Sequence, residues 1–359
     1  MVRSIPLSST GSQLIEGMHT NPRFWLISAY SLAHFLVDFA CAFGVFRNIL
    51  QTPDAHFCVL LYNFCAFAMQ MPLGILADKW NRNALLAIFG CLLVGMAYGF
   101  SSIPLVAVVV AGMGNALFHI GGGVDVLNVS EKKLAALGVF VSPGAFGIYL
   151  GALLGRGNAL SSLPILLALV GVAGFIFMAH RMQGGAYPKN AAFSLDNARA
   201  SKMLLAAVCL FLVVGLRSYV GLSLNFPWKG IGHWGVALVC AVVLGKTAGG
   251  FLADSLGMGR TLFFSLSLAA LLFLFPQTPL LGVVAVLLFN MTMPLTLFLM
   301  AKLFPGAKGF SFGLLTFALF LGFLPIHLGL PSPTAGWPFA LATALSLALL
   351  ALAWRNAKA

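Results

Sequence analysis

The chain has 359 residues, of which 60% are hydrophobic and only 8% are charged. A soluble protein of this length could not bury so much apolar surface, so the composition excludes a soluble globular domain and indicates a polytopic membrane protein. The formal net charge of +12 would suit a nucleic-acid-binding protein. In a membrane protein, however, basic residues accumulate in cytoplasmic loops, and we expect no nucleic-acid partner.

Twelve apolar segments, most of them about 20 residues long, follow one another along the chain. The predicted spans cover residues 22–46, 55–77, 83–101, 103–127, 133–155, 160–180, 203–225, 232–253, 260–275, 279–303, 308–330 and 335–354. The polar segment 1–21 lacks the apolar run of a secretory signal and is predicted to be a cytoplasmic tail. We expect an all-α polytopic membrane protein whose two six-helix halves, 22–180 and 203–354, are joined by a cytoplasmic linker, 181–202. Residues 355–359 form a second tail.

The distribution of basic residues orients these spans. With both termini in the cytoplasm, most Lys and Arg residues outside the spans are cytoplasmic, and only Arg47, Arg156 and Lys229 lie in outer loops. This is a strong positive-inside bias, which the opposite topology would reverse. We therefore expect an integral protein of a bacterial cytoplasmic membrane with both termini inside.

The first predicted span contains two ionisable residues. His34 and Asp38 are four positions apart and therefore share a helix face. An ionisable side chain at bilayer depth costs about 2.5–3.5 kcal/mol and is seldom retained without a partner or an aqueous cavity. Asp38 lies near the midplane, where we expect it to exchange a proton with His34 as its partner. The alternative is a structural pair that fixes this helix to a neighbour.

A charged loop follows the second span and returns, altered, after the eighth. The first copy reads Gly74-Ile-Leu-Ala-Asp78-Lys-Trp-Asn-Arg82, and the second runs from Gly250 through Asp254 to Arg260. The two copies are about half the chain length apart. Matching loops in two membrane-embedded halves are typical of transporters built from structural repeats.

These loops resemble the signature between helices 2 and 3 of the major facilitator superfamily, roughly G-x-L-A-D-R-x-G-R. Asn81 departs from it where glycine is usual. The resemblance implies the major facilitator fold and a conformational latch at the cytoplasmic helix ends, in which the carboxylates face helix N-termini or pair with Arg. The latch residues would be Gly74, Asp78, Arg82, Gly250, Asp254 and Arg260. The alternative is a tight charged turn with no role in switching.

The fourth span contains a finer resemblance. The run Gly112-Met-Gly-Asn115-Ala-Leu-Phe-His119 is similar to the G-x-G-x-x-x-F-H pattern in the fourth helix of fosmidomycin-resistance-type efflux proteins. Ile120 and Gly121 depart from that pattern, because Pro and an acidic residue usually follow the His. Asn115 and His119 share a face and are predicted to contact a ligand near mid-membrane; close helix packing is the alternative.

Glycines dominate the fifth span. Gly147, Gly151 and Gly155 share one face at four-residue spacing, as in close helix–helix contacts. The preceding Ser142-Pro143-Gly144 loosely resembles the Gly-Pro motif of proton antiporters in the superfamily. This resemblance favours export over uptake, although simple packing accounts for the glycines equally well.

The second half offers two polar residues at membrane depth. Arg217 lies in the seventh span, the counterpart of the first, and needs an anion. It either pairs with Asp38 across a cavity or binds an anionic group of the substrate directly. Asn290, with Pro294, marks a polar kink in the tenth span that we expect to line the cavity.

The chain lacks a P-loop and an HExxH motif, so neither ATP-driven transport nor an enzyme is indicated, and we expect no catalytic residues and no cofactor. The scatter of His56, His180, His233 and His327 predicts no metal site. The pattern favours a secondary active transporter that exports a small organic molecule in exchange for protons. Proton- or Na⁺-coupled uptake of a metabolite and a non-transporting receptor or scaffold remain open. We expect a monomer surrounded by membrane lipid.

Overall fold

The computed structural model describes residues 22–130, 133–157, 160–183 and 200–358. The predicted tail 1–21 and most of the predicted linker therefore lie outside the described residues. In chain order the helices are α2 (Pro22–Gly44), the π-helical turn η1 (Val45–Ile49), α3 (Ala55–Asn63), the π-helical turn η2 (Phe64–Ala68), α4 (Gln70–Trp80), α5 (Asn83–Ala97), the 3₁₀ turn η3 (Tyr98–Phe100), α6 (Pro104–Val129), α7 (Leu134–Val141), α8 (Pro143–Gly157), α9 (Ser162–Met182), α10 (Ala200–Ser223), α11 (Trp234–Leu256), α12 (Met258–Phe273), α13 (Pro279–Asn290), α14 (Thr292–Leu303), α15 (Lys308–His327) and α16 (Trp337–Lys358).

These helices confirm the predicted all-α fold and the positions of the twelve spans. Within the described ranges, eleven helical segments are long and apolar enough to cross a membrane, whereas α12 has only 16 residues. The second, fifth and tenth spans are each divided into shorter helices. The fifth is broken where Pro143, which has no amide hydrogen to donate, begins α8.

Glycine faces allow the helices to pack closely. Gly147, Gly151 and Gly155 of α8 lie against the backbone of α2, and a Cβ atom at any of them would overlap it or press tightly against it. Gly90 of α5 and Gly114 of α6 are in similar contact with each other's helix. Lipid is as apolar as the side chains, so close packing rather than the hydrophobic effect holds such helices together. The structure thus confirms the predicted glycine face of the fifth span.

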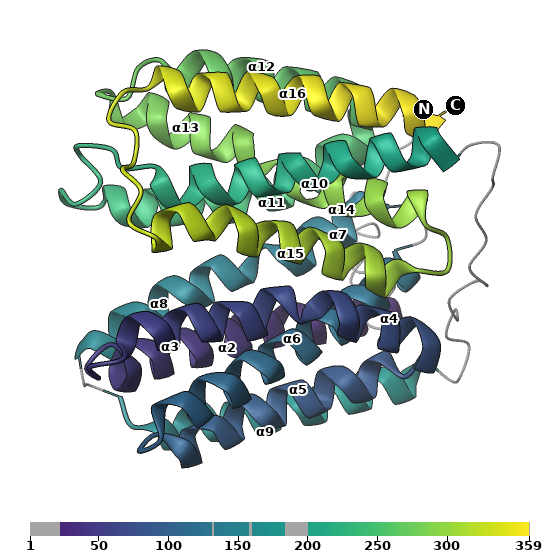
Figure 1. The fold of residues 1–359 in the computed structure, drawn as a ribbon. Helices are drawn as coiled ribbons and strands as arrows, with labels where there is room; N and C mark the ends of the chain where they lie inside the picture. Colours follow the sequence, from purple (N-terminus) through teal and green to yellow (C-terminus); the bar gives the residue numbers. More distant parts are fainter. Residues whose placement is uncertain (1–21, 131–132, 158–159, 184–199, 359) are drawn as a thin grey trace, which may run out of the picture.

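The helices form two groups, α2–α9 and α10–α16 (Figure 1). Within the first group, α7 and α8 lie on the side that faces the second group, where both contact α11. The groups meet where α4 packs along α15 and α7 packs along α11. We call this the closed end; it contains Trp80, Leu134 and Lys308, and it is the end at which the chain terminates (Figure 1).

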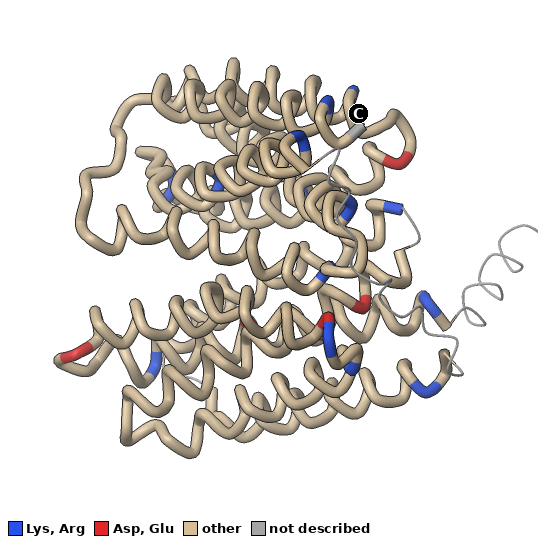
Figure 2. Tube along the Cα trace, turned by 45° about the vertical axis from the view of Figure 1, so that its right-hand side comes forward, with Lys and Arg blue, Asp and Glu red and all other residues tan. Residues whose placement is uncertain are grey.

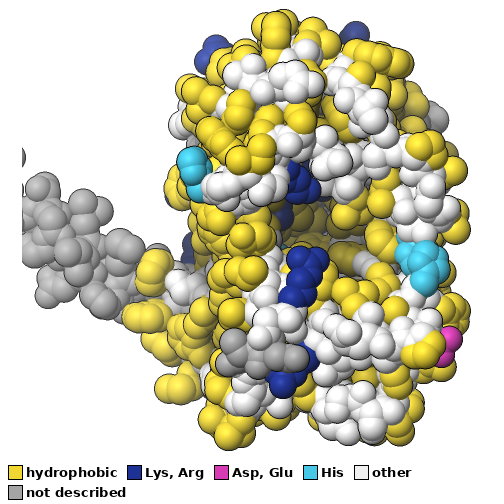
Figure 3. Space-filling view, turned by 90° about the vertical axis from the view of Figure 1, so that its left-hand side faces the viewer, with side chains coloured by type: hydrophobic (Ala, Val, Ile, Leu, Met, Phe, Trp, Pro, Cys, Tyr) yellow, Lys and Arg dark blue, Asp and Glu magenta, His cyan; other side chains and the backbone are white. Residues whose placement is uncertain are grey.

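The opposite end, which we call the open end, is hollowed between the two groups (Figure 3). The groups still touch on one side of it, where the rings of His56 and His327 stack with centroids 3.8 Å apart. The described halves are therefore in contact at the closed end, through α4 with α15 and α7 with α11, and separated by a cleft at the open end.

The glycine face makes a direct test of this packing possible. We expect Gly151→Leu to destabilise the protein by about 1–3 kcal/mol, because the added side chain must displace the backbone of α2. Thermal unfolding followed by size-exclusion chromatography in detergent measures this change. Gly171→Leu is the matched control, since Gly171 on α9 has nothing within 4 Å of a Cβ position. Equal melting temperatures for the two variants would contradict the α2–α8 contact.

Candidate functional site

Three ionisable side chains meet between α2 and α6. His34 Nε2 lies 3.0 Å from His119 Nε2 and 3.3 Å from Asp38 Oδ2. The other carboxylate oxygen, Asp38 Oδ1, lies 3.7 Å from His119 Nε2. The residues are only 6%, 8% and 9% exposed for His34, Asp38 and His119. We call these three residues the His–Asp–His cluster.

The partners of the two rings determine where their protons lie. His34 Nδ1 is 2.7 Å from the Phe140 carbonyl oxygen, and His119 Nδ1 is 2.9 Å from the Asn115 carbonyl oxygen. A carbonyl only accepts, so each Nδ1 carries the hydrogen, and the Nε2 atom of each neutral ring has a lone pair. Two lone pairs and an ionised carboxylate then converge on one point. This arrangement is repulsive unless a proton or another cation lies among them.

Two neighbours complete the surroundings of the cluster. Asn115 Nδ2 donates a hydrogen bond to Asp38 Oδ1 at 3.1 Å, so the predicted ligand contact is a partner of Asp38 in this structure. Gly144 of α8 lies beside the cluster, where a Cβ atom would overlap both Asp38 Oδ2 and His34 Nε2. The backbone of Gly144 therefore packs directly against these two atoms, and no larger residue fits at this position without displacing them.

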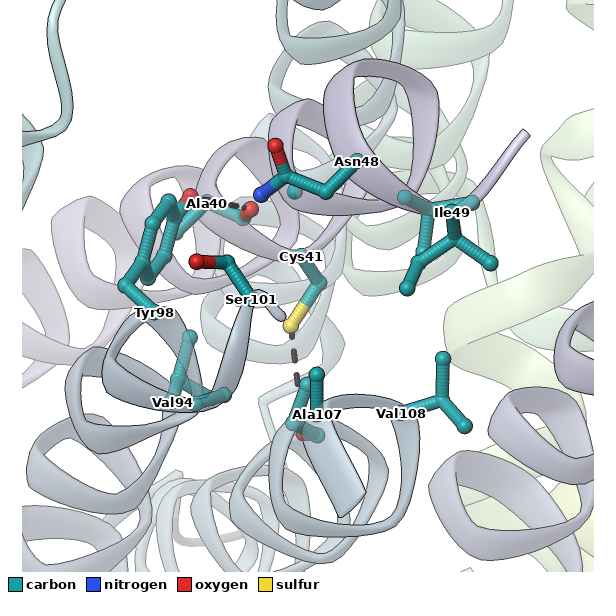
Figure 4. A pocket seen from close by; sticks show the side chains of 13 residues that line it. Ala40, Cys41, Asn48, Ile49, Val94, Tyr98, Ser101, Ala107 and Val108 are labelled. Carbon is teal, nitrogen blue, oxygen red and sulfur yellow. Dashed lines mark hydrogen bonds between the residues drawn. The ribbon is translucent and has the colours of Figure 1, made fainter. Parts of the chain in front are cut away.

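A small pocket is lined by the end of α2 and the residues that follow it, together with parts of α5 and α6 (Figure 4). Cys41 is on its wall and is also 3.7 Å from Asn115 Nδ2, which connects the pocket to the cluster. Most of the lining is apolar, and the Tyr98 hydroxyl donates to the Ala40 carbonyl oxygen at 2.6 Å. The pocket suits water or an apolar group better than a charged substrate.

The candidate residues of the second half do not join the cluster. Arg217 donates to Thr296 Oγ1 at 3.2 Å, and among the described residues it forms no salt bridge with Asp38. Asn290 donates to the Val286 carbonyl oxygen of its own helix at 2.8 Å. The pairing of Asp38 with Arg217, which was one of two alternatives, is absent from this state of the protein.

At the closed end, the first copy of the loop motif contacts the second half. Asp78 accepts hydrogen bonds from the amides of Gly309 and Phe310, at 2.7 and 2.8 Å. These are among the first amides of α15, which have no partner within their own helix. Gly74, one turn before Asp78, lies so close to Gly309 that a Cβ atom would overlap its backbone. The motif glycine permits the approach, and the aspartate caps the helix.

The second copy of the motif, in the second half, makes the corresponding contact with a helix of the first half. Asp254 accepts hydrogen bonds from the amides of Leu134 and Ala135, at 2.8 and 2.9 Å, at the start of α7. A Cβ atom at Gly250 would overlap the backbone of the same two residues. Neither α7 nor α15 is capped by the side chain of its own N-cap residue. Each aspartate thus caps a helix of the other half, a pair of contacts that we call the trans-caps.

The motif arginines take no part in these contacts. Arg82 and Arg260 are exposed, and within the described part of the chain neither side chain forms a hydrogen bond or a salt bridge. Lys308 supplies a third contact between the halves instead, donating to Asn128 Oδ1 at 2.7 Å. Among the described residues, the contacts that the two loop motifs make with the opposite half therefore come from their aspartates and not from their arginines.

Helix α7 lies between the cluster and the second half. On one side its Phe140 carbonyl accepts from His34. On the other side its Val141 carbonyl accepts from Lys246 Nζ at 3.2 Å, and Ser142 Oγ is 2.7 Å from Thr247 Oγ1. With its first amides capped by Asp254, this eight-residue helix touches both the cluster and the closed end.

Sequence reasoning missed several of these residues. The Phe140 carbonyl, which fixes the His34 ring, has no side-chain signal. Lys308 and Asn128 are ordinary polar residues near helix ends. The four-residue spacing of Gly309 and Gly313 is a sequence signal of a close helix contact at this end of α15. Both glycines approach the backbone of α4 as closely as the motif glycine Gly74 approaches α15.

Comparison with known proteins places the fold. No model of a known protein family matches the sequence, and a search of curated proteins finds no match. Solved structures do match. The fucose:proton symporter FucP of E. coli has a TM-score of 0.66 and 13% identity, covering 93% of this chain and 99% of that one. FucP in the outward conformation has a TM-score of 0.60 and 14% identity, with 92% and 99% coverage.

A bacterial homologue of the iron transporter ferroportin in the outward-facing state is also similar, with a TM-score of 0.59 and 18% identity. That match covers 94% of this chain and 98% of the other. Similarity at these identities concerns the fold, and the fosmidomycin-resistance resemblance remains a prediction. The structural similarity to these solved transporters, together with the two helix groups and the duplicated Gly–Asp contacts, shows that this chain has the fold of the major facilitator superfamily transporters.

Proposed function

We propose that the protein is a secondary active transporter that moves a small organic molecule by alternating access. The pair of trans-caps carries this proposal. Each joins the halves through two backbone amides and one carboxylate at the closed end, while the open end is hollowed (Figure 3). A helix cap contributes about 0.5–2 kcal/mol, which is small enough to break in every transport cycle. Two of the similar structures are described as outward, which supports an outward-facing state here.

The coupling ion in this proposal is a proton held by the His–Asp–His cluster. The convergence of two Nε2 lone pairs and the Asp38 carboxylate supports it, because the cluster needs at least one proton to be stable. The small residual exposure of the cluster allows that proton to exchange with water.

Helix α7 supplies the route from this proton to the closed end. Loss of the proton changes the charge beside His34, whose ring is bonded to the Phe140 carbonyl. Any movement of α7 in response alters its contacts with Lys246 and Asp254 in the second half. One rigid element with contacts on both sides is the kind of link that energetic coupling requires.

Export is the direction we favour, on the resemblance of the fourth and fifth helices to efflux proteins and antiporters. Uptake is the second candidate, supported by the similarity to a fucose:proton symporter. In either case Arg217, which donates a hydrogen bond to the neutral side chain of Thr296, is available for an anionic group of the substrate.

The proposed location is a bacterial cytoplasmic membrane, with the closed end in the cytoplasm. Most Lys and Arg positions lie toward the end at which the chain terminates (Figure 2), and the positive-inside rule assigns such an end to the cytoplasm. We propose that the protein acts as a monomer, since each chain contains both halves of the transport path.

Proton coupling predicts a pH signal that depends on Asp38. In inside-out membrane vesicles with an acidic lumen, addition of pooled metabolites or drugs raises the luminal pH if substrate enters in exchange for protons. Asp38→Asn abolishes this rise, because the neutral amide cannot hold the proton. A pH-sensitive dye trapped in the lumen follows the signal.

Asp54→Asn serves as the matched control, because Asp54 is an exposed carboxylate at the open end. Right-side-out vesicles with acid outside test the opposite direction, since substrate uptake with protons then acidifies the lumen. A pH change of equal rate in the natural chain and Asp38→Asn would overturn the proton site.

The trans-caps predict coupled protection of two distant helix ends. Asp78→Ala removes a cap of about 1 kcal/mol, which corresponds to about fivefold in the opening of the closed end. We expect hydrogen–deuterium exchange to accelerate by about this factor in the peptide containing Gly309 and also in the one containing Leu134. Asp254→Ala has the same double effect.

The reason is that opening of the closed end exposes both helix N-termini together. Asp54→Ala, at the open end, is expected to leave both peptides unchanged. Acceleration confined to the helix that each aspartate caps would show local fraying and would remove the trans-caps from the switching mechanism.

A further inference from the structure

We propose that the His–Asp–His cluster also binds one divalent transition-metal ion of the Zn²⁺ type, which replaces the coupling proton. The ligands are Nε2 of His34, Nε2 of His119 and the carboxylate of Asp38. This deepens the proton site proposed above and rests on that proposal for its effect on transport. The metal-binding step itself stands on the geometry of the three side chains alone.

The spacing of the three ligand atoms fits a tetrahedral ion. With ligands about 2.0–2.1 Å from zinc, two corners of a tetrahedron lie about 3.3 Å apart. The observed separations are 3.0 Å between the two Nε2 atoms, 3.3 Å from His34 Nε2 to Asp38 Oδ2 and 3.7 Å from His119 Nε2 to Asp38 Oδ1. Taking one ligand atom from each residue, the three atoms lie within 4.8 Å of one another. A small turn of the carboxylate and small shifts of the rings therefore bring one atom of each residue to coordination distance.

The ring orientation also fits a metal site. Both Nδ1–H groups donate to backbone carbonyls, which holds the two Nε2 lone pairs toward the common point. Such a second hydrogen bond is typical of metal-bound histidine, because it fixes the tautomer and the ring plane. Asn115 orients the carboxylate in the same way by its bond to Asp38 Oδ1.

The chemistry of the ligands selects the class of ion. Two imidazole nitrogens and one carboxylate favour Zn²⁺ and its first-row neighbours over Mg²⁺ or Ca²⁺, which prefer oxygen ligands. Three protein ligands leave a fourth position for water or for a substrate group.

From the sequence we expected no metal site, because His56, His180, His233 and His327 are scattered. The cluster uses other histidines. Its two ring nitrogens come from helices that are far apart in sequence, and only their packing in the fold brings His119 to the His34–Asp38 pair.

Binding must release the proton that the cluster holds, since the metal and the proton use the same lone pairs. The balance is one protonated cluster and one Zn²⁺ giving one metal-bound cluster and one free proton. Isothermal titration of the purified full chain with ZnCl₂, at pH 7 in non-coordinating buffers of different ionisation enthalpy, measures both the stoichiometry and the protons released. We expect one ion bound and about one proton released per chain.

Titration with CoCl₂ tests the geometry independently. Tetrahedral Co²⁺ absorbs visible light far more strongly than octahedral Co²⁺, and we expect the intense spectrum. His119→Gln removes one ligand and is expected to weaken Zn²⁺ binding by at least about 100-fold. Loss of a residue that only hydrogen-bonds to a ligand already weakens metal binding by about 10–100-fold, and loss of the ligand itself costs at least as much. His233→Gln is the control, because His233 lies in the loop before α11, outside the cluster.

The outcomes separate this inference from the proton site. Failure of the natural chain to bind Zn²⁺ at one ion per chain, or equal binding by His119→Gln, overturns the metal site and leaves proton coupling to be judged by the vesicle signal. Binding of one ion without proton release supports the metal site and overturns the protonated cluster. Binding with release of about one proton, lost in His119→Gln only, supports both.

Discussion

The first amides of a helix have no partner within that helix, and in this protein two such sets are satisfied by carboxylates from the opposite half. Asp78 caps α15 and Asp254 caps α7, each across the interface and each four residues after a glycine that allows the backbones to touch. The duplicated sequence motif is therefore a duplicated physical contact. Because a cap is worth only about 0.5–2 kcal/mol, the two together hold the closed end without making it permanent.

Helix α7 connects this interface to the charged centre of the first half. It receives the Asp254 cap at its start, accepts from Lys246 near its end and bonds the His34 ring through Phe140. The helix ends at Val141, and Pro143 begins α8 two residues later. In the mechanism that we propose, this short helix moves as a unit and thereby links the cluster to the closed end.

Much of the fold could be predicted from the sequence. A long apolar segment in lipid has no water to bond to its backbone amides and carbonyls, and it makes these hydrogen bonds within itself by forming a helix. The positions of the spans and the glycine face of α8 followed from composition and spacing. The pairs His34–Asp38 and Asn115–His119 also followed, since each lies on one turn of one helix. Their union into one cluster did not, because it depends on how α2 and α6 pack.

The partners of the motif residues were equally hidden. The amides of Gly309 and Leu134 are backbone groups and leave no trace in residue type. The sequence could therefore offer a helix N-terminus or an arginine as the partner of each aspartate, but it could not say which helix. The charge of Arg217 indicated an anion near it, but the sequence could not distinguish Asp38 from a substrate group. Backbone contacts and tertiary pairing thus account for most of what sequence reasoning missed.

The most direct test of alternating access is a pair of spin-label distances at the two ends of the protein. Double electron–electron resonance on Lys79→Cys with Lys302→Cys reports the closed end, and Gln51→Cys with Lys229→Cys reports the open end, each in a background with the six native cysteines replaced. Changing the pH, or adding Asp38→Asn, is predicted to lengthen one distance while shortening the other. Distances that stay fixed at both ends under all these conditions would contradict alternating access and favour a rigid scaffold.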